Sequence, residues 1–164
     1  MERDIDLINH IKGTGGATIE QITALFFPSY VRASIRLKQL KDYGYLKSEQ
    51  HEIGKIVYYT DKLPSTHNLY INEILIALRG KYKAFKRNAN LEHCQVDLAI
   101  RLKNGKMVIF EIERFNRVTK EKQTKIKQDV AEPYDLWIVT ARQSDGGKGR
   151  INYNDIKKVS NYYK

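Results

Sequence analysis

Cysteine is nearly absent from this sequence: Cys94 is the one thiol among 164 residues. A single thiol excludes an intramolecular disulfide and a zinc site built on several cysteines. Long apolar runs are also absent, because no stretch approaches the roughly 20 residues that a membrane-spanning helix needs. The N-terminus, MERDIDLI, lacks the basic and apolar regions of a signal peptide. We therefore expect a cytoplasmic protein without a membrane partner.

Two catalytic motifs are missing as well. The four histidines, His10, His51, His67 and His93, are scattered and do not form the histidine-hydrophobe-histidine metal motif of the commonest tyrosine relaxases. The glycine-rich residues 143–149 lack the spacing and the Ser or Thr of a phosphate-binding P-loop. Neither chemistry is expected of this chain.

Acidic residues are the minority among the charges, with 19 Asp and Glu against 29 Lys and Arg and a net charge of +10. Such an excess is common in proteins that meet polyanions, because Lys and Arg displace counterions from phosphates. Eleven tyrosines supply flat faces that stack on bases or pack in the fold. Nucleic acid is the favoured partner, and charge that serves only solubility is the alternative.

Residues 1–62 predict three helices followed by a hairpin, the order of a winged helix-turn-helix. Thr18 and Gln21 have the spacing of a capping box at the start of the second helix. Ser29 is the expected N-cap of the third helix, and Gly44 is expected to end it in a left-handed conformation.

The third helix is the predicted DNA-reading element. Its apolar residues recur at helical spacing and are expected to face the core: Val31, Ile35, Leu37 and Leu40. Its other side chains are basic, with no acid before Asp42. A basic second helix of a helix-turn-helix lies in the major groove, where arginine bridges guanine O6 and N7. We expect double-stranded DNA to be bound by Ser29, Arg32, Ser34, Arg36, Lys38 and Lys55. A solvated basic face and a protein-docking module are the alternatives.

Residues 61–65 form a short polar linker, so that the second domain is expected to span residues 66–164. Its expected elements are a helix from 66 that ends at Gly80, helices at 119–130 and 154–159, strands at 82–86, 136–140 and within 96–113, and a loop at 88–90. The order helix, strands, helix, strand predicts a small mixed sheet flanked by helices. The predicted fold class of the whole chain is therefore α+β.

Residues 96–113, VDLAIRLKNGKMVIFEIE, concentrate three acids on a predicted hairpin. Asn104-Gly105 favours a tight turn, and strand alternation puts Glu111 and Glu113 on one face. Pairing across that turn would bring Asp97 beside them. Gathered carboxylates cost free energy unless a cation, a proton or a basic ligand compensates them. We therefore expect the active site here; ordinary surface acids paired with lysines are the alternative.

A helix with an acid, then an aspartate on one strand, then acid-X-acid at the end of the next strand, resembles the PD-(D/E)XK nuclease core. The resemblance puts Asp97 at the motif aspartate, Glu111 at the second acid, and Glu113 where lysine is usual. Lys125 or Lys127, on the following basic helix, is expected to replace that lysine. The implied catalytic residues are Asp97, Glu111, Glu113 and Lys125.

The same resemblance implies a Mg²⁺ or Mn²⁺ cofactor. Magnesium prefers oxygen ligands and keeps several waters, so two or three acids suffice. Asp97 and Glu111 would be the core ligands. Glu73, on the preceding helix, is the third expected ligand, with Glu113 or Glu92 as further candidates.

Short motifs over most of the chain carry a second resemblance: the Gln21-Ile22 helix, Arg36-Leu37 with Leu40 and Gly44, Val57-Tyr58-Tyr59-Thr60, His67-Asn68, Asp97, and Glu111-Ile112-Glu113. Together they resemble the replication-relaxation family, which includes MobC-type plasmid mobilisation proteins. That implies a protein that recognises an origin of transfer or replication, nicks DNA there with a divalent metal, and works with a relaxase or other relaxosome proteins. The alternative is a non-enzymatic relaxosome accessory factor or transcriptional regulator with an inactive nuclease-like dimerisation domain. A homodimer is compatible with both.

Overall fold

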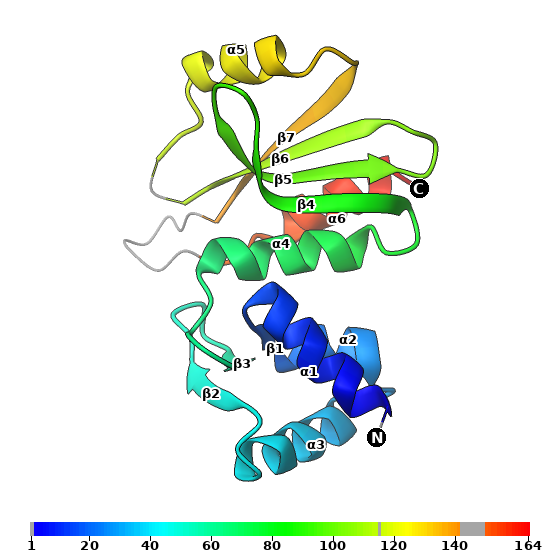
Figure 1. Cartoon of the computed structure of the whole chain (residues 1–164), viewed down its shortest axis with the longest axis vertical. Coiled ribbons are helices and arrows are strands. Elements are labelled where there is room, and N and C mark those ends of the chain that lie inside the picture. Colours follow the sequence, from blue (N-terminus) through cyan, green and yellow to red (C-terminus); the bar gives the residue numbers. More distant parts are fainter. Residues whose placement is uncertain (1, 115, 142–149) are drawn as a thin grey trace. The chain divides into compact units, whose positions relative to one another are not determined.

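The computed structural model describes residues 2–114, 116–141 and 150–164, and the chain divides into two compact units, Met1–Ile76 and Ala77–Lys164 (Figure 1). The described residues form six helices and two sheets, which confirms the α+β class. None of the helices in these ranges has the length and apolar character to cross a membrane. The glycine-rich residues 143–149 lie outside the described ranges.

The first unit holds seven elements: α1 (Glu2–Thr14), β1 (Ala17–Thr18), α2 (Ile19–Phe26), α3 (Tyr30–Asp42), β2 (Lys47–Gln50), β3 (Ile56–Tyr59) and all but the last residue of α4 (Thr66–Ala77). Its strands form an antiparallel sheet in the order β1-β3-β2. The two-residue strand β1 was not predicted, because it is too short for any periodic pattern. Whether residues 1–62 form a domain by themselves stays a prediction.

The predicted caps set the helix boundaries of this unit. The Thr18 hydroxyl accepts from the Gln21 amide and the Gln21 side chain accepts from the Thr18 amide, both at 3.1 Å, which confirms the capping box. Ser29 caps α3 by accepting from the Arg32 amide. Gly44 follows the end of α3 with a φ of 83°, the left-handed conformation expected there.

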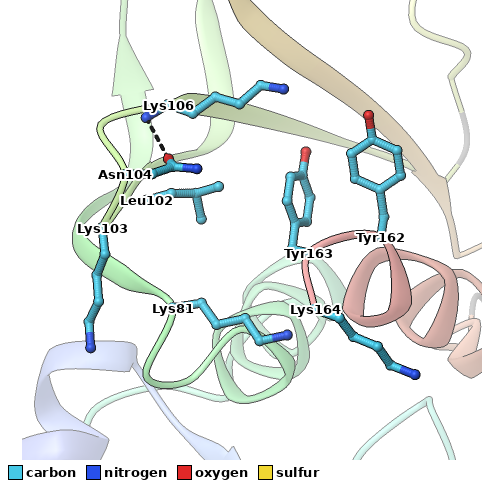
Figure 2. A pocket seen from close by; sticks show the side chains of 8 residues that line it. All are labelled: Lys81, Leu102, Lys103, Asn104, Lys106, Tyr162, Tyr163 and Lys164. Carbon is cyan, nitrogen blue, oxygen red and sulfur yellow. Dashed lines mark hydrogen bonds between the residues drawn. The ribbon is translucent and has the colours of Figure 1, made fainter.

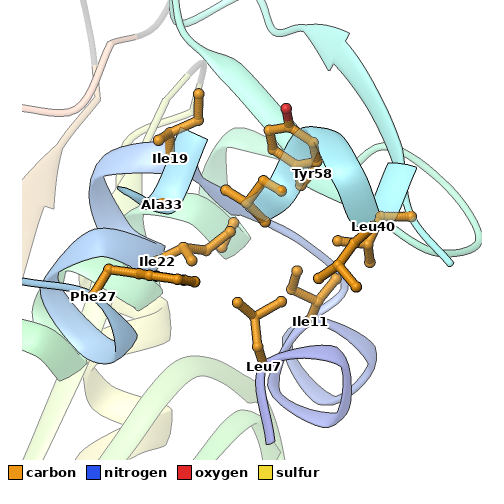
Figure 3. Close-up of a cluster of buried hydrophobic side chains, with 11 residues drawn as sticks. Leu7, Ile11, Ile19, Ile22, Phe27, Ala33, Leu40 and Tyr58 are labelled. Carbon is orange, nitrogen blue, oxygen red and sulfur yellow. The ribbon is translucent and has the colours of Figure 1, made fainter. Parts of the chain in front are cut away.

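The core of the first unit joins apolar side chains from α1, α2, α3 and β3 (Figure 3). From α3 it takes Ala33, Leu37 and Leu40. The prediction that Val31 and Ile35 face the core is wrong, since they are 64% and 56% exposed. Each lies two positions from Ala33, about 200° around the helix, and so on the opposite face.

The second unit is built from β4 (Tyr82–Asn90), β5 (Gln95–Leu102), β6 (Met107–Glu113), α5 (Lys120–Asp129), β7 (Tyr134–Thr140) and α6 (Tyr153–Tyr162). The sheet order is β4-β5-β6-β7, with β7 parallel to β6 and the other pairs antiparallel. The helices α5 and α6 cover opposite faces (Figure 1). This confirms the predicted mixed sheet flanked by helices.

The start of this sheet differs from the prediction. Residues 88–90, expected to be a loop, are the end of β4, where Ala89 pairs with Val96. Asn88 keeps the turn-like character that suggested a loop, with a φ of 47°, but inter-strand pairing continues past it. Tertiary pairing therefore overrides the local preference of asparagine for turns.

The turn between β5 and β6 lies where it was predicted. The Leu102 amide donates to Lys106 O and the Gly105 amide donates to Leu102 O, each at 2.9 Å. Gly105 has a φ of 88°, which a glycine adopts without strain. The resulting register pairs Leu98 with Phe110 and so decides where the acids of this hairpin lie.

Candidate functional site

Asp97 and Glu111 lie side by side at the open end of the β5–β6 hairpin. The register that pairs Leu98 with Phe110 continues with Asp97 beside Glu111. Asp97 Oδ2 accepts a hydrogen bond from the Ile112 amide at 2.7 Å, which fixes the side chain against β6. The predicted approach of these two acids is thus present in the structure.

Glu111 is an unusual carboxylate because it is 2% exposed. Its Oε2 accepts from Lys122 Nζ at 2.6 Å, whereas its Oε1 is buried without a hydrogen-bond partner among the described residues. Burial raises the pKa of Glu111 above its ordinary value, the Lys122 ammonium lowers it, and the Asp97 charge raises it. Asp97, Glu111 and Lys122 are called the carboxylate centre below.

The lysine at this centre is Lys122, not the expected Lys125. Lys125 Nζ lies 3.3 Å from Glu121, one turn away on α5. The sequence held a signal for this choice: Lys122 stands four residues before Ile126, the buried residue of α5, and so shares its face. The prediction of Lys125 rested on the basic character of this helix and not on its periodicity.

The other predicted acids have other neighbours. Glu113 Oε1 accepts from the Val118 amide at 2.9 Å. Glu73 belongs to the first unit, where its carboxylate accepts from Gln21 Nε2 at 3.1 Å. Their roles as catalytic residue and metal ligand stay predictions.

A second group of potential ligands was not predicted. Within the described ranges, Glu92, His93 and Asp129 have ligand atoms that all lie within 4.8 Å of one another. Asp129 already binds His93 twice, at Nδ1 (2.5 Å) and at the amide (2.7 Å), and this contact raises the pKa of His93. Both carboxylate oxygens of Asp129 therefore have a hydrogen-bond partner in His93. The contact joins α5 to the turn between β4 and β5.

The predicted DNA-binding residues of α3 fall into two groups. Arg32 and Lys38 are exposed and Ser34 is half-buried. Arg36 is bound instead to Asp4 of α1, with Nε–Oδ1 and Nη2–Oδ2 distances of 3.0 and 2.6 Å. The Nε–Nη2 edge of its guanidinium, which could bind guanine, is thus occupied by a carboxylate, and Nη1 donates to Gln39 Oε1 at 2.7 Å.

The remaining two predicted DNA contacts also have internal partners. Ser29 is the N-cap of α3. Lys55, which immediately precedes β3, has its Nζ 3.7 Å from Glu20 Oε1, and its side chain is 30% exposed.

The net positive charge of the chain comes from the second unit. Residues 1–76 contain nine Lys and Arg and nine Asp and Glu, whereas residues 77–164 contain 20 and 10. The whole net charge of +10 thus belongs to the unit that carries the carboxylate centre. A polyanion is attracted mainly to that unit.

Comparison with known proteins adds little to this geometry. No protein-family model matches the chain, and no curated protein matches it. A repair endonuclease from Pyrococcus abyssi resembles it in structure, with 17% sequence identity and a TM-score of 0.38. The match covers 66% of this chain and 48% of that one, so this chain spans about half the length of that protein. A TM-score of this size does not assign a fold or a function.

Proposed function

We propose that this protein processes DNA and that the carboxylate centre is a divalent-metal site of the PD-(D/E)XK nuclease type. The observation that carries the proposal is the buried Glu111 Oε1, unpartnered within the described ranges, beside the Asp97 carboxylate. An unsatisfied buried carboxylate oxygen is costly, and Mg²⁺ or Mn²⁺ would satisfy it. The donor set of this structure therefore fits the cofactor that the nuclease resemblance implies.

Each residue of the centre has a distinct role in this proposal. Asp97 and Glu111 would hold the cation. When bound, Mg²⁺ or Mn²⁺ supplies Lewis-acid stabilisation of the charge that develops on the phosphate during phosphodiester cleavage. Lys122 would donate to a phosphate oxygen. It would thus replace the lysine of the nuclease motif, whose position is occupied by Glu113 in this chain.

The first unit would supply recognition of double-stranded DNA. Three helices followed by a hairpin support a winged helix-turn-helix, with α3 as the reading helix. Arg32, Lys38 and Lys41 are its exposed basic residues, and the apolar Val31 and Ile35 of the same helix are exposed as well. Recognition of an origin of transfer or replication, with a relaxase as partner, belongs to the same proposal.

A second candidate has a specific observation in its favour. Outside Glu111 Oε1, the acids are engaged by the protein itself: Asp97 by the Ile112 amide, Glu111 by Lys122, and Glu113 by Val118. Such a centre suits a non-enzymatic DNA-binding protein, an accessory factor or regulator, in which the acids only hold the sheet edge and α5 together.

Metal binding and DNA nicking together separate the two candidates. We expect calorimetry to detect Mn²⁺ binding to the full chain, weakened at least about tenfold by Glu111→Gln or Asp97→Asn, because each removes a charged ligand. We expect a supercoiled plasmid that carries the cognate origin to be nicked with Mg²⁺ or Mn²⁺, and both variants to abolish the nicking.

Glu121→Gln is the matched control, because Glu121 is an exposed acid of α5 outside the centre. It should bind Mn²⁺ and nick DNA like the unmodified chain. Metal binding without nicking would favour the non-enzymatic candidate. If Mn²⁺ does not bind, or binds equally to Glu111→Gln, the metal centre is refuted.

A further inference from the structure

A second feature of the second unit lies at the other end of the β5–β6 hairpin. A pocket of about 550 Å³ opens between the β5–β6 turn and the C-terminal end of α6 (Figure 2). Four lysines and two tyrosines form most of its lining: Lys81, Lys103, Lys106, Lys164, Tyr162 and Tyr163. None of the described residues that line it is acidic. Its volume suits a ligand of nucleotide size.

Four lysines bring positive charge to this pocket. Lys106 Nζ lies 3.0 Å from Asp135 Oδ2, so its charge is compensated. Lys81 Nζ has a weaker partner, the Ser160 carbonyl at 3.5 Å. In Figure 2, Lys81 and Lys106 extend along opposite edges of the pocket, while Lys103 points outward from its rim. Ammonium groups that lie close together favour binding of an anion between them. Asp135 carries one negative charge and cannot neutralise four lysines.

The tyrosines supply a rigid aromatic surface beside these charges. The Tyr163 hydroxyl donates to Asp135 Oδ2 at 2.6 Å and accepts from Trp137 Nε1 at 2.8 Å. Tyr162 packs edge-on against Tyr163, with 4.9 Å between ring centroids, yet it is 63% exposed. An aromatic ring that is held in place and still faces solvent is a platform on which a base can stack.

We propose that this pocket binds one nucleotide of a single-stranded nucleic acid, with the phosphate at the lysines and the base stacked on Tyr162. A base paired inside a duplex cannot offer its face to a side chain, so the ring selects an unpaired strand. The site is separate from the carboxylate centre, because Lys106 immediately precedes β6 and Glu111 lies five residues further along that strand, a span of about 17 Å. The inference therefore needs neither a bound metal nor cleavage.

Trp137 reports on this pocket directly. It is the one tryptophan of the chain, and its ring centroid lies 5.5 Å from that of Tyr162. We would follow its fluorescence in the full chain, with EDTA present, during titration with a thymidylate oligonucleotide of about 12 residues. Thymidine monophosphate and inorganic phosphate would be titrated in parallel.

We expect the oligonucleotide to change the Trp137 emission and to bind at least about tenfold more tightly than the mononucleotide, because neighbouring phosphates add contacts. Tyr162→Leu should weaken oligonucleotide binding about tenfold, while Tyr162→Phe retains it, since stacking needs the ring and not the hydroxyl. The double variant Lys81→Ala, Lys103→Ala should make the plot of log affinity against log salt concentration less steep by about 1.4. Each lost phosphate contact on a single strand accounts for about 0.7 of this change.

Two variants on α6 are matched controls: Tyr153→Leu removes another exposed ring, and Lys157→Ala removes another exposed charge. Both should bind the oligonucleotide like the unmodified chain. The proposal is overturned if the oligonucleotide leaves the Trp137 emission unchanged or if the controls lose as much affinity as the pocket variants. Equal affinity for the mononucleotide and the oligonucleotide would overturn the assignment to a strand. Phosphate binding as tight as nucleotide binding, with no effect of Tyr162→Leu, would reduce the pocket to an anion site.

Discussion

Gly16 lies at the point where α1, β3 and α4 of the first unit meet. Its φ is 152°, and its carbonyl accepts from Asn72 Nδ2 at 3.0 Å. A Cβ atom there would lie 2.8 Å from Pro64 Cγ and 3.0 Å from Tyr58 O. The second of these is backbone, which cannot move aside as a flexible side chain can.

We expect Gly16→Ala to destabilise the protein by about 1–3 kcal/mol, as overpacked sites do. Gly13 is the matched control, because it lies within α1 and a Cβ atom there meets nothing within 4 Å. Gly13→Ala should leave stability unchanged or raise it by up to about 1 kcal/mol. Thermal unfolding followed by circular dichroism measures both, and equal midpoints for the two variants would contradict the prediction.

The Asp4–Arg36 pair makes the stability of the first unit depend on pH. The hydrogen bond from Arg36 lowers the pKa of Asp4 below its ordinary value. A carboxyl whose pKa is lowered on folding stabilises the protein above its unfolded pKa of about 3.9, and this contribution is lost as the pH falls through the folded value. At pH 7 the pair therefore contributes in full.

We expect Asp4→Asn to cost about 1 kcal/mol at pH 7, the upper end for a surface pair, because the contact is bidentate. The difference from the unmodified chain should shrink as the pH falls from about 3.9, the unfolded pKa, through the lower folded pKa of Asp4. Asp6→Asn, at an exposed site on the same helix, is the control and should cost less at pH 7. Urea unfolding at several pH values provides the measurement, and a difference that does not vary with pH would refute this role for Asp4.

At the scale of an element, two arginines of α3 that are equivalent in the sequence pattern have different surroundings in the structure. Arg32 and Arg36 are one turn apart, and both were expected to contact DNA. Arg36 instead joins α3 to α1, while Arg32 is exposed at the first turn of the helix. Exposure of Val31 and Ile35 on the same helix leaves an outer surface that is both apolar and basic.

We expect Arg32→Ala to weaken binding of a duplex that carries the cognate site by about 1–3 kcal/mol, without lowering the melting temperature. Arg36→Ala should lower the melting temperature, because it leaves the Asp4 carboxylate without its guanidinium. Fluorescence anisotropy and thermal melts measure the two effects, with Lys12→Ala on α1 as the control for lost charge. A duplex affinity that Arg32→Ala leaves unchanged would exclude α3 as the reading helix.

At the scale of the whole molecule, charge and recognition are divided between the two units. The unit expected to read DNA is neutral overall, whereas the unit with the carboxylate centre and the lysine pocket carries the full +10. Salt-dependent attraction to nucleic acid is therefore expected from the second unit, and any sequence preference from the first.

The sequence by itself determined the local features: the capping box at Thr18, the glycine after α3, the turn at Gly105, and strands that put Asp97 beside Glu111. These follow from chemistry within a few residues, or from a short hairpin whose register a turn decides. Near neighbours along the chain suffice to predict such features.

Only the tertiary structure decided which partners the side chains take. It chose Lys122 for Glu111 and Asp4 for Arg36, and it gathered Lys81, Lys106 and Tyr162 into one pocket. These contacts join residues from separate elements, and their formation depends on how sheets and helices pack. Periodicity along one element indicates at most the face that a residue shares, as for Lys122 and Ile126, and not the residue that it meets on another element. The pocket at the β5–β6 turn could not be predicted from the sequence for the same reason. Its lining comes from three segments that are distant in sequence.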